Sequence, residues 1–143
     1  MKPYTKIRQF TAQELEEELG EYFENDHTKS KFPNLAKDKN ELKNMIKNAR
    51  LVNLTVNELM KLDNSDVCDI LASSNPYQAA FIMAKDNERN IDRVYDGIKS
   101  NIAFPAPIVI KKNSQLYCMA GNTRICAFAA INLSISVKLI LHK

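Results

Sequence analysis

The chain has 143 residues, about the length of one domain, so it can bury a core of normal size without disulfides or metals. Its net charge of +3 allows an anionic ligand but does not require nucleic acid, because proteins that hold a phosphate backbone usually carry a concentrated basic face. No apolar run reaches the roughly 18 residues of a membrane helix, and the polar start lacks the pattern of a signal peptide. We therefore expect a cytoplasmic protein with no membrane segment.

Residues 1–50 predict a helical arm. Thr11 and Glu14 form a capping box at the start of a helix. The apolar residues that follow at helical spacing are Leu15, Leu19, Tyr22 and Phe23. Residues 25–40 are polar and contain one proline, which predicts a loop or hinge. The apolar stripe of a second helix contains Leu42, Met45, Ile46 and Ala49.

Residues 51–143 predict a compact α/β domain. Alternating apolar residues over 50–56 predict its first strand. Helices are expected over residues 65–72, 75–85 and 90–100. The remaining elements are a proline-led strand over 105–112, a turn at Asn113 and Ser114, a strand over 115–120, a helix over 123–132 and a strand over 134–141. The expected fold class of the whole chain is α+β.

Aromatic residues are concentrated in the arm. They are Tyr4, Phe10, Tyr22, Phe23 and Phe32. Such side chains need a surface to cover. The arm is therefore expected to dock either on the α/β domain of its own chain or on a second copy, in a homodimer.

The stretch MAGNTRICAFAAINL, residues 119–133, places a glycine where a strand passes into a helix. The first N–H groups of a helix lack internal partners and carry partial positive charge, so a phosphate is stabilised there. Gly121 allows close approach of the backbone, Asn122 and Thr123 add donors, and Arg124 adds a charge that can bind phosphate oxygens through two hydrogen bonds. The structural alternative is a Gly–Asn turn, a threonine cap and an exposed arginine.

The wider context of this loop resembles a known family. Residues 104–140, FPAPIVIKKNSQLYCMAGNTRICAFAAINLSISVKLI, resemble the N-terminal domain of ParB partition proteins and the sulfiredoxin-like fold that shares it. The shared order is a proline-led strand, a hairpin, a second strand, a Gly-x-x-Arg loop, an alanine-rich helix and a strand. Upstream, residues 75–78 look like the family's Asn-Pro-x-Gln box, and the resemblance spans roughly residues 51–142.

The resemblance implies nucleotide binding within a small mixed sheet with flanking helices. In this fold the Gly-x-x-Arg loop holds nucleotide phosphates, from CTP in partition proteins and from ATP in sulfiredoxins and in relatives that phosphorylate small molecules. Matched by position, Gly121 and Arg124 keep the phosphate-loop roles, and Asn122 and Thr123 become loop donors. The implied ligand is a nucleoside triphosphate with Mg²⁺.

The chain also departs from the family pattern. Sulfiredoxins carry their reactive cysteine directly after the loop glycine, where this chain has Asn122, and Cys118 is expected to point into the core, which argues against sulfinate reduction. Partition proteins usually carry a glutamate there and then a second arginine, and the replacement of both by Asn122 and Thr123 argues against their CTP chemistry. No helix-turn-helix follows the last strand before Lys143, so chromosome partitioning is not expected of this chain alone.

Acidic residues cluster after the first predicted strand. They are Glu58, Asp63, Asp66 and Asp69. In kinase-like relatives an acidic residue near this region serves the reaction, and Glu58 follows the strand most closely, so it is the candidate catalytic residue. Acids beside short helices are also common as solvated caps. His27 and His142 lie far apart in the sequence, so no metal site of the zinc type is expected.

The sequence therefore predicts a domain that binds nucleotide phosphates and that could act as an NTP-dependent kinase or an NTPase. The alternative is a module without enzymatic activity that uses the same basic loop to bind DNA or another protein. Fold similarity alone does not give the reaction.

Overall fold

The computed structural model describes residues 4, 6–24, 26–60, 62–64, 91–131 and 133–142. It has helices and a mixed sheet, which confirms the α+β class. The main sheet has five strands in the order β2-β7-β5-β6-β3. Their bounds are β2 (Arg50–Asn53), β3 (Asp63–Asn64), β5 (Ile108–Lys112), β6 (Gln115–Ala120) and β7 (Ser136–His142).

The central strands of the sheet, β5, β6 and β7, were all predicted from the sequence. Strands β5 and β6 form an antiparallel hairpin with its turn at Asn113, where φ is 59°. Strand β7 then returns parallel to β5, and β2 pairs antiparallel with β7 at the edge of the sheet. A separate two-stranded sheet pairs β1 (Ile7–Arg8) in parallel with β4 (Phe104–Pro105).

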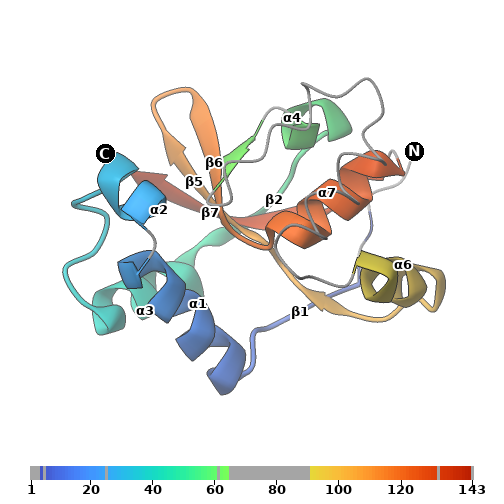
Figure 1. Ribbon diagram of the computed structural model, residues 1–143, viewed down its shortest axis with the longest axis horizontal. Coiled ribbons are helices and arrows are strands. Elements are labelled where there is room, and N and C mark those ends of the chain that lie inside the picture. Colours follow the sequence, from blue (N-terminus) through green and yellow to red (C-terminus); the bar gives the residue numbers. More distant parts are fainter. Residues whose placement is uncertain are drawn as a thin grey trace.

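Helices cover both faces of the main sheet (Figure 1). The described helices are α1 (Ala12–Glu24), α2 (Asp26–Lys31), α3 (Lys39–Asn48), α4 (Val56–Met60), α6 (Ile91–Lys99) and α7 (Asn122–Ala130). Helices α1, α2 and α3 lie on one side of the strands, and α4, α6 and α7 lie on the other (Figure 1). The molecule is therefore built in three layers around the β5–β6–β7 strands.

Alternation along the central strands supplies two apolar cores, because successive side chains of a strand point to opposite faces. The arm-side core contains Leu19, Tyr22, Phe32, Leu35, Ala36, Leu42, Ile46, Ile108, Ile110, Tyr117, Met119, Ala120 and Ile140. The α7-side core contains Tyr4, Leu54, Leu59, Leu62, Phe104, Val109, Cys118, Ile125, Phe128, Ala129, Ile135 and Val137. Cys118 lies in the second of these, as the sequence predicted.

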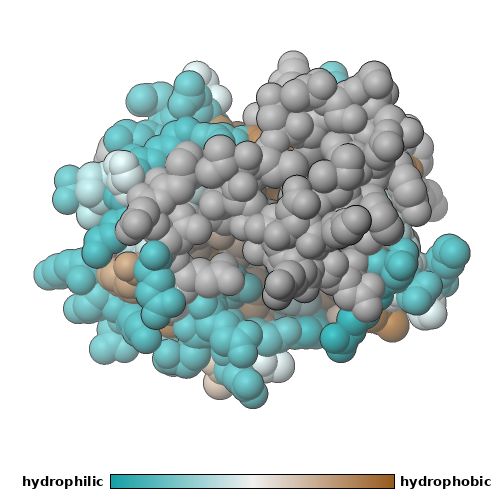
Figure 2. Space-filling model, viewed as in Figure 1, coloured by the Kyte–Doolittle hydropathy of each residue, from teal (hydrophilic) through white to brown (hydrophobic). Residues whose placement is uncertain are grey.

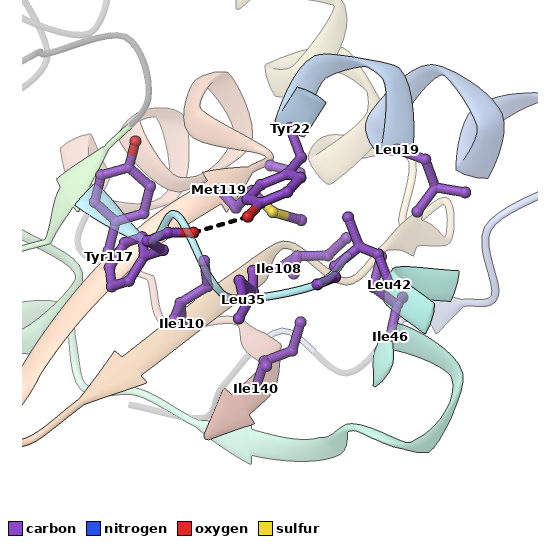
Figure 3. Close-up of a cluster of buried hydrophobic side chains, with 13 residues drawn as sticks. Leu19, Tyr22, Leu35, Leu42, Ile46, Ile108, Ile110, Tyr117, Met119 and Ile140 are labelled. Atoms are coloured by element: carbon purple, nitrogen blue, oxygen red, sulfur yellow. Dashed lines mark hydrogen bonds between the residues drawn. The ribbon is translucent and has the colours of Figure 1, made fainter. Parts of the chain in front are cut away.

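Side chains of the arm pack directly on the sheet of the same chain. Figure 3 shows Leu19, Tyr22, Leu42 and Ile46 facing the strand residues of the arm-side core. The Tyr22 hydroxyl donates to the Phe32 carbonyl at 2.7 Å, which ties α1 to the segment after α2. In this structure the apolar stripes of α1 and α3 are thus covered in cis.

Polar contacts join the same two layers. The hydroxyls of Thr28 in α2 and Tyr117 in β6 are hydrogen bonded at 2.6 Å. The buried Lys138 of β7 donates from Nζ to the Ile46 carbonyl at 3.2 Å, in the last turns of α3. A cation beside helix C-terminal carbonyls is favoured by the helix dipole, and the contact also satisfies the ammonium group.

The structure corrects two sequence expectations. Residues 25–40 are not simply a loop, because α2 lies inside this range and α3 begins at Lys39. The first strand ends at Asn53, and Val56 already begins α4. Strand β3 was not expected. The helices expected over residues 65–72 and 75–85 lie outside the described residues.

On the face shown in Figure 2, the coloured residues are mainly hydrophilic, and apolar residues show only in small patches. Within the described ranges, no helix combines the length and the apolar character needed to cross a bilayer.

Candidate functional site

The loop at Gly121 joins the end of β6 to the start of α7. Gly121 is the N-cap of α7 and has φ +93°, a left-handed conformation that side chains disfavour. Its carbonyl accepts from the Ile125 N–H at 2.9 Å, which begins the hydrogen bonds of the helix. Because glycine has no side chain, it cannot cap the remaining N–H groups of the first helical turn.

Close packing also requires glycine at this position. A Cβ atom added at Gly121 would lie 2.8 Å from the Pro107 Cβ and 3.0 Å from the Arg124 Nη2. Pro107, which leads into β5, therefore lies against the loop, and the guanidinium of Arg124 lies close to Gly121. This brings together two of the residues that the sequence assigned to phosphate binding.

Arg124 has an unusual environment for a cation. The residue keeps partial exposure, but its Nε and Nη2 atoms are buried and have no hydrogen-bond partner among the described residues. Burial lowers the pKa of Arg124, and the Glu18 carboxylate partly opposes this effect. Since a guanidinium stays protonated in proteins, the site retains its positive charge.

The position of this charge favours binding of an anion. Arg124 lies in the first turn of α7, where the helix dipole is positive and repels a cation. A buried donor without a partner costs about 1–3 kcal/mol, and more when it is charged. An anion at the loop would accept from the guanidinium and from free N–H groups of the helix.

Asn122 and Thr123 form the first helical positions of α7 with their backbone. The structure describes these backbones and not the side chains, so the predicted donor roles of the two side chains stay predictions. The backbone N–H groups at these positions belong to the first turn, which has no internal acceptors.

Glu58 lies in a different place from this loop. It forms a capping box at the start of α4: its Oε1 accepts from the Thr55 N–H at 3.0 Å, and the Thr55 Oγ1 accepts from the Glu58 N–H at 3.1 Å. It also lines a cavity of about 670 Å³ together with Lys31, Asp63 and Tyr117. Tyr117 is near the start of β6 and Gly121 follows its end, so the cavity and the loop lie toward opposite ends of this strand.

The cavity has an aromatic wall and charges of both signs. Lys31 forms an ion pair with Asp63 and lies 5.5 Å from the centre of the Tyr117 ring. Phe32 contacts the same ring edge-on, with centroids 5.0 Å apart. Among the side chains that the structure describes, no group of three or more His, Cys, Asp or Glu residues could hold a metal ion.

The contribution of the arm to the loop was missed in the sequence. Helix α1 brings the carboxylates of Glu14 and Glu18 close enough to raise the pKa of Arg124 against the dominant effect of burial. No local pattern links these residues, because they are far apart in the chain and meet only after α1 docks on the sheet. The sequence therefore located the loop but not its acidic neighbours.

Comparisons with protein-family models, with curated proteins and with solved structures give no match to this chain. The ParB/sulfiredoxin-like resemblance accordingly stays a prediction from the residues themselves.

Proposed function

We propose that the Gly121–Arg124 loop binds the phosphate groups of a nucleoside triphosphate at the N-terminus of α7. One observation carries this proposal: the guanidinium of Arg124 has buried Nε and Nη2 atoms without hydrogen-bond partners among the described residues, directly over the loop glycine. Phosphate oxygens would supply the acceptors that these atoms lack.

The geometry of the loop supports a phosphate rather than a larger neutral group. Gly121 at the N-cap has no side chain, so no side-chain cap hydrogen bond is made at the start of α7. Backbone N–H groups of a first helical turn, a helix dipole and a guanidinium together form the combination that holds phosphates at helix N-termini. Each of the three favours negative charge.

We also propose that residues 51–143 adopt the ParB/sulfiredoxin-like fold. This is supported by the order of the described elements, in which the β5–β6 hairpin leads through the glycine loop into α7 and then into β7 parallel to β5. The resemblance associates this order with nucleotide phosphates held at the same loop.

Transfer or hydrolysis of the terminal phosphate is a further part of the proposal, with Mg²⁺ carried by the nucleotide. Glu58 is the candidate from the sequence for an acidic role, although its carboxylate caps α4 and lines the cavity toward the opposite end of β6 from the loop. Substitution of Glu58 therefore tests its role in transfer or hydrolysis of the phosphate only if nucleotide affinity and folding are measured in the same variant. A capping contact of this kind contributes about 0.5–2 kcal/mol to stability.

The test is nucleotide binding by the Arg124→Ala variant. Thermal-shift and calorimetric titrations with ATP, CTP, GTP and ADP, with and without Mg²⁺, identify the ligand of the wild-type chain. We expect Arg124→Ala to lose about 1.5–3 kcal/mol of binding free energy, the range for a hydrogen bond to a charged group. This corresponds to a loss of roughly ten-fold to 150-fold in affinity.

Arg50→Ala is the matched control, because Arg50 is exposed on β2 and its removal changes the net charge equally. The control should bind like the wild type. Equal affinities of folded Arg124→Ala and wild-type chains would refute the phosphate-loop proposal. A salt-dependent shift of DNA mobility without nucleotide would instead support the DNA-binding alternative.

A further inference from the structure

The cavity of about 670 Å³ lies at the hairpin end of the sheet. The β5–β6 hairpin lies between α2 and α4 in Figure 1, and residues of all three segments line the cavity. Its volume falls within the range of roughly 300–1,000 Å³ that is usual for sites of small organic ligands. The phosphate loop follows the other end of β6 and does not use this space.

Residues from both faces of the sheet line this cavity. Side chains alternate along a strand, so Lys112 lies on the same face of β5 as the buried Ile110 of the arm-side core. Leu116 instead packs against the α7-side core, and Glu58 belongs to α4, which lies on that side (Figure 1). The cavity therefore passes around the edge of the sheet, beside the two-residue strand β3.

The ionic groups of the cavity balance, with two lysines and two acidic residues in its lining. Lys31 and Asp63 form an ion pair with each other. Lys112 has no ion pair with any residue that the structure describes. The Glu58 Oε1 atom accepts from the Thr55 N–H, and within the described ranges its Oε2 atom has no hydrogen-bond donor. One cation and one carboxylate oxygen are thus left for a ligand, and they come from opposite faces of the sheet.

Buried rings hold the wall between these two charges in place. Tyr117 and Phe32 are almost fully buried and meet edge-on, with centroids 5.0 Å apart. The Tyr117 hydroxyl is also hydrogen bonded to Thr28 at 2.6 Å. Leu116 is half-buried and gives the wall an apolar contact surface. A fixed wall with apolar surface and a few polar groups is typical of a preformed ligand site.

We propose that this cavity binds a short peptide with charged ends, about two to three residues long. The ammonium end lies at Glu58, the carboxylate end lies at Lys112, and the middle of the peptide packs on Leu116. This site is separate from the phosphate loop and does not depend on it.

The separation of the two charges selects a peptide over smaller or more acidic ligands. An extended tripeptide holds its charged ends roughly 10 Å apart. A single amino acid carries both charges on one carbon, which suits a site whose two ionic partners are adjacent. A nucleotide is disfavoured here, because its phosphates would be repelled by Glu58 and Asp63.

Peptides with blocked ends test the two charges on the wild-type chain. The probe is the tripeptide Ala-Phe-Ala with free ends, titrated by calorimetry beside its N-acetylated and its C-amidated forms. We expect each block to weaken binding about five-fold, the upper range for a partly exposed ion pair.

Lys112→Gln and Lys111→Gln form the matched pair of variants. Lys111 is the neighbouring residue of β5, is exposed, and lies on the other face of the strand. Lys112→Gln should weaken binding of the free peptide about five-fold, and C-amidation should then cause no further loss. Lys111→Gln should bind the peptide like the wild type.

Glu58→Gln tests the ammonium end in the same way. Glutamine also serves in a capping box, so the start of α4 is kept. In this variant N-acetylation of the peptide should cause no further loss of affinity. If Glu58→Gln does not fold, the acetylated peptide on the wild-type chain decides the role of this end.

Three results would overturn the proposal. They are no binding of the free peptide to the wild type, equal binding of free and blocked peptides, and equal affinities of Lys112→Gln and Lys111→Gln. Loss of peptide binding in Arg124→Ala, with full binding in Lys112→Gln, would place the peptide at the phosphate loop and also overturn it. Nucleotide affinity should be unchanged in Lys112→Gln, so failure of this proposal is distinguishable from failure of the phosphate site.

Discussion

Gly121 shows how backbone conformation and close packing together can restrict a position to glycine. Its φ of +93° and the 2.8 Å approach of an added Cβ to Pro107 mean that alanine would be strained twice. We expect Gly121→Ala to lower the free energy of unfolding by about 1–3 kcal/mol. Urea denaturation followed by circular dichroism measures this change.

Gly20→Ala is the control for this prediction. Gly20 lies inside α1, and an added Cβ there would meet no atom within 4 Å. We expect this variant to be more stable by about 0.5–1 kcal/mol, because alanine favours a helix interior over glycine. Similar losses in both variants would show that the conformation of Gly121 is not what matters.

At the same scale, the sequence predicted the residues of the loop but not their surroundings. A glycine followed after three positions by an arginine is visible in the letters alone, because it needs only local spacing. The close approach of Pro107 and of the Arg124 guanidinium to Gly121 depends on how β5 and α7 pack at the loop, and the effect of Glu18 on the pKa of Arg124 depends on the docking of α1. Contacts of this kind are set by tertiary packing, which local spacing does not encode.

At the scale of elements, capping boxes in the sequence correspond to helix starts in the structure. The polar composition of residues 25–40, in contrast, did not predict the helices found there. The Thr11–Glu14 capping box is confirmed by hydrogen bonds of 2.9 and 3.2 Å. The same signal at Thr55–Glu58 was overlooked in favour of apolar alternation, and it is the reason that the strand ends before α4. Helix α2 has no clear signal of its own.

Tertiary contacts explain why α2 forms. Isolated helices this short are marginal in water, so α2 depends on what it packs against. Thr28 bonds to the hydroxyl of Tyr117, and Phe32, directly after the helix, contacts the ring of the same residue. A composition-based expectation of a loop over residues 25–40 could not include these partners.

The start of α1 gives a prediction about pH. Hydrogen bonds from Arg8, with those from Thr11, lower the pKa of Glu14 from 4.5 to about 2. A carboxyl with a lowered pKa stabilises the folded chain above its ordinary pKa, and this stability is lost as the pH falls from about 4.5 to about 2. Glu14→Gln should therefore lower the free energy of unfolding by about 0.5–1 kcal/mol at pH 6 and by much less near pH 2.

Denaturation of the wild type and Glu14→Gln at several pH values measures this difference. Because glutamine does not titrate, the gap between the two chains reports the Glu14 carboxylate alone. A gap of the same size at pH 6 and near pH 2 would contradict the role assigned to Arg8 and the capping box.

At the scale of the whole molecule, the sequence correctly indicated the α+β class. The order of hairpin, loop, helix and strand follows from alternation and turn residues that are close together in the chain. The pairing of β3 with β6 and of β1 with β4 joins distant segments and was not expected. The division into residues 1–50 and 51–143 stays a prediction, because the arm-side core draws on both ranges.

That shared core leads to a test of whether the arm folds independently. Leu42 of α3 is fully buried against the sheet, so Leu42→Ala should lower the free energy of unfolding by about 2–5 kcal/mol. If arm and sheet form one cooperative unit, hydrogen exchange should speed up equally for the most protected amides of α1 and of β5. Leu59→Ala, in the α7-side core, should have the same uniform effect. Wild-type protection retained in β5 beside lost protection in α1 and α3 would instead show that the arm is a separate unit, docked on a sheet that is stable without it.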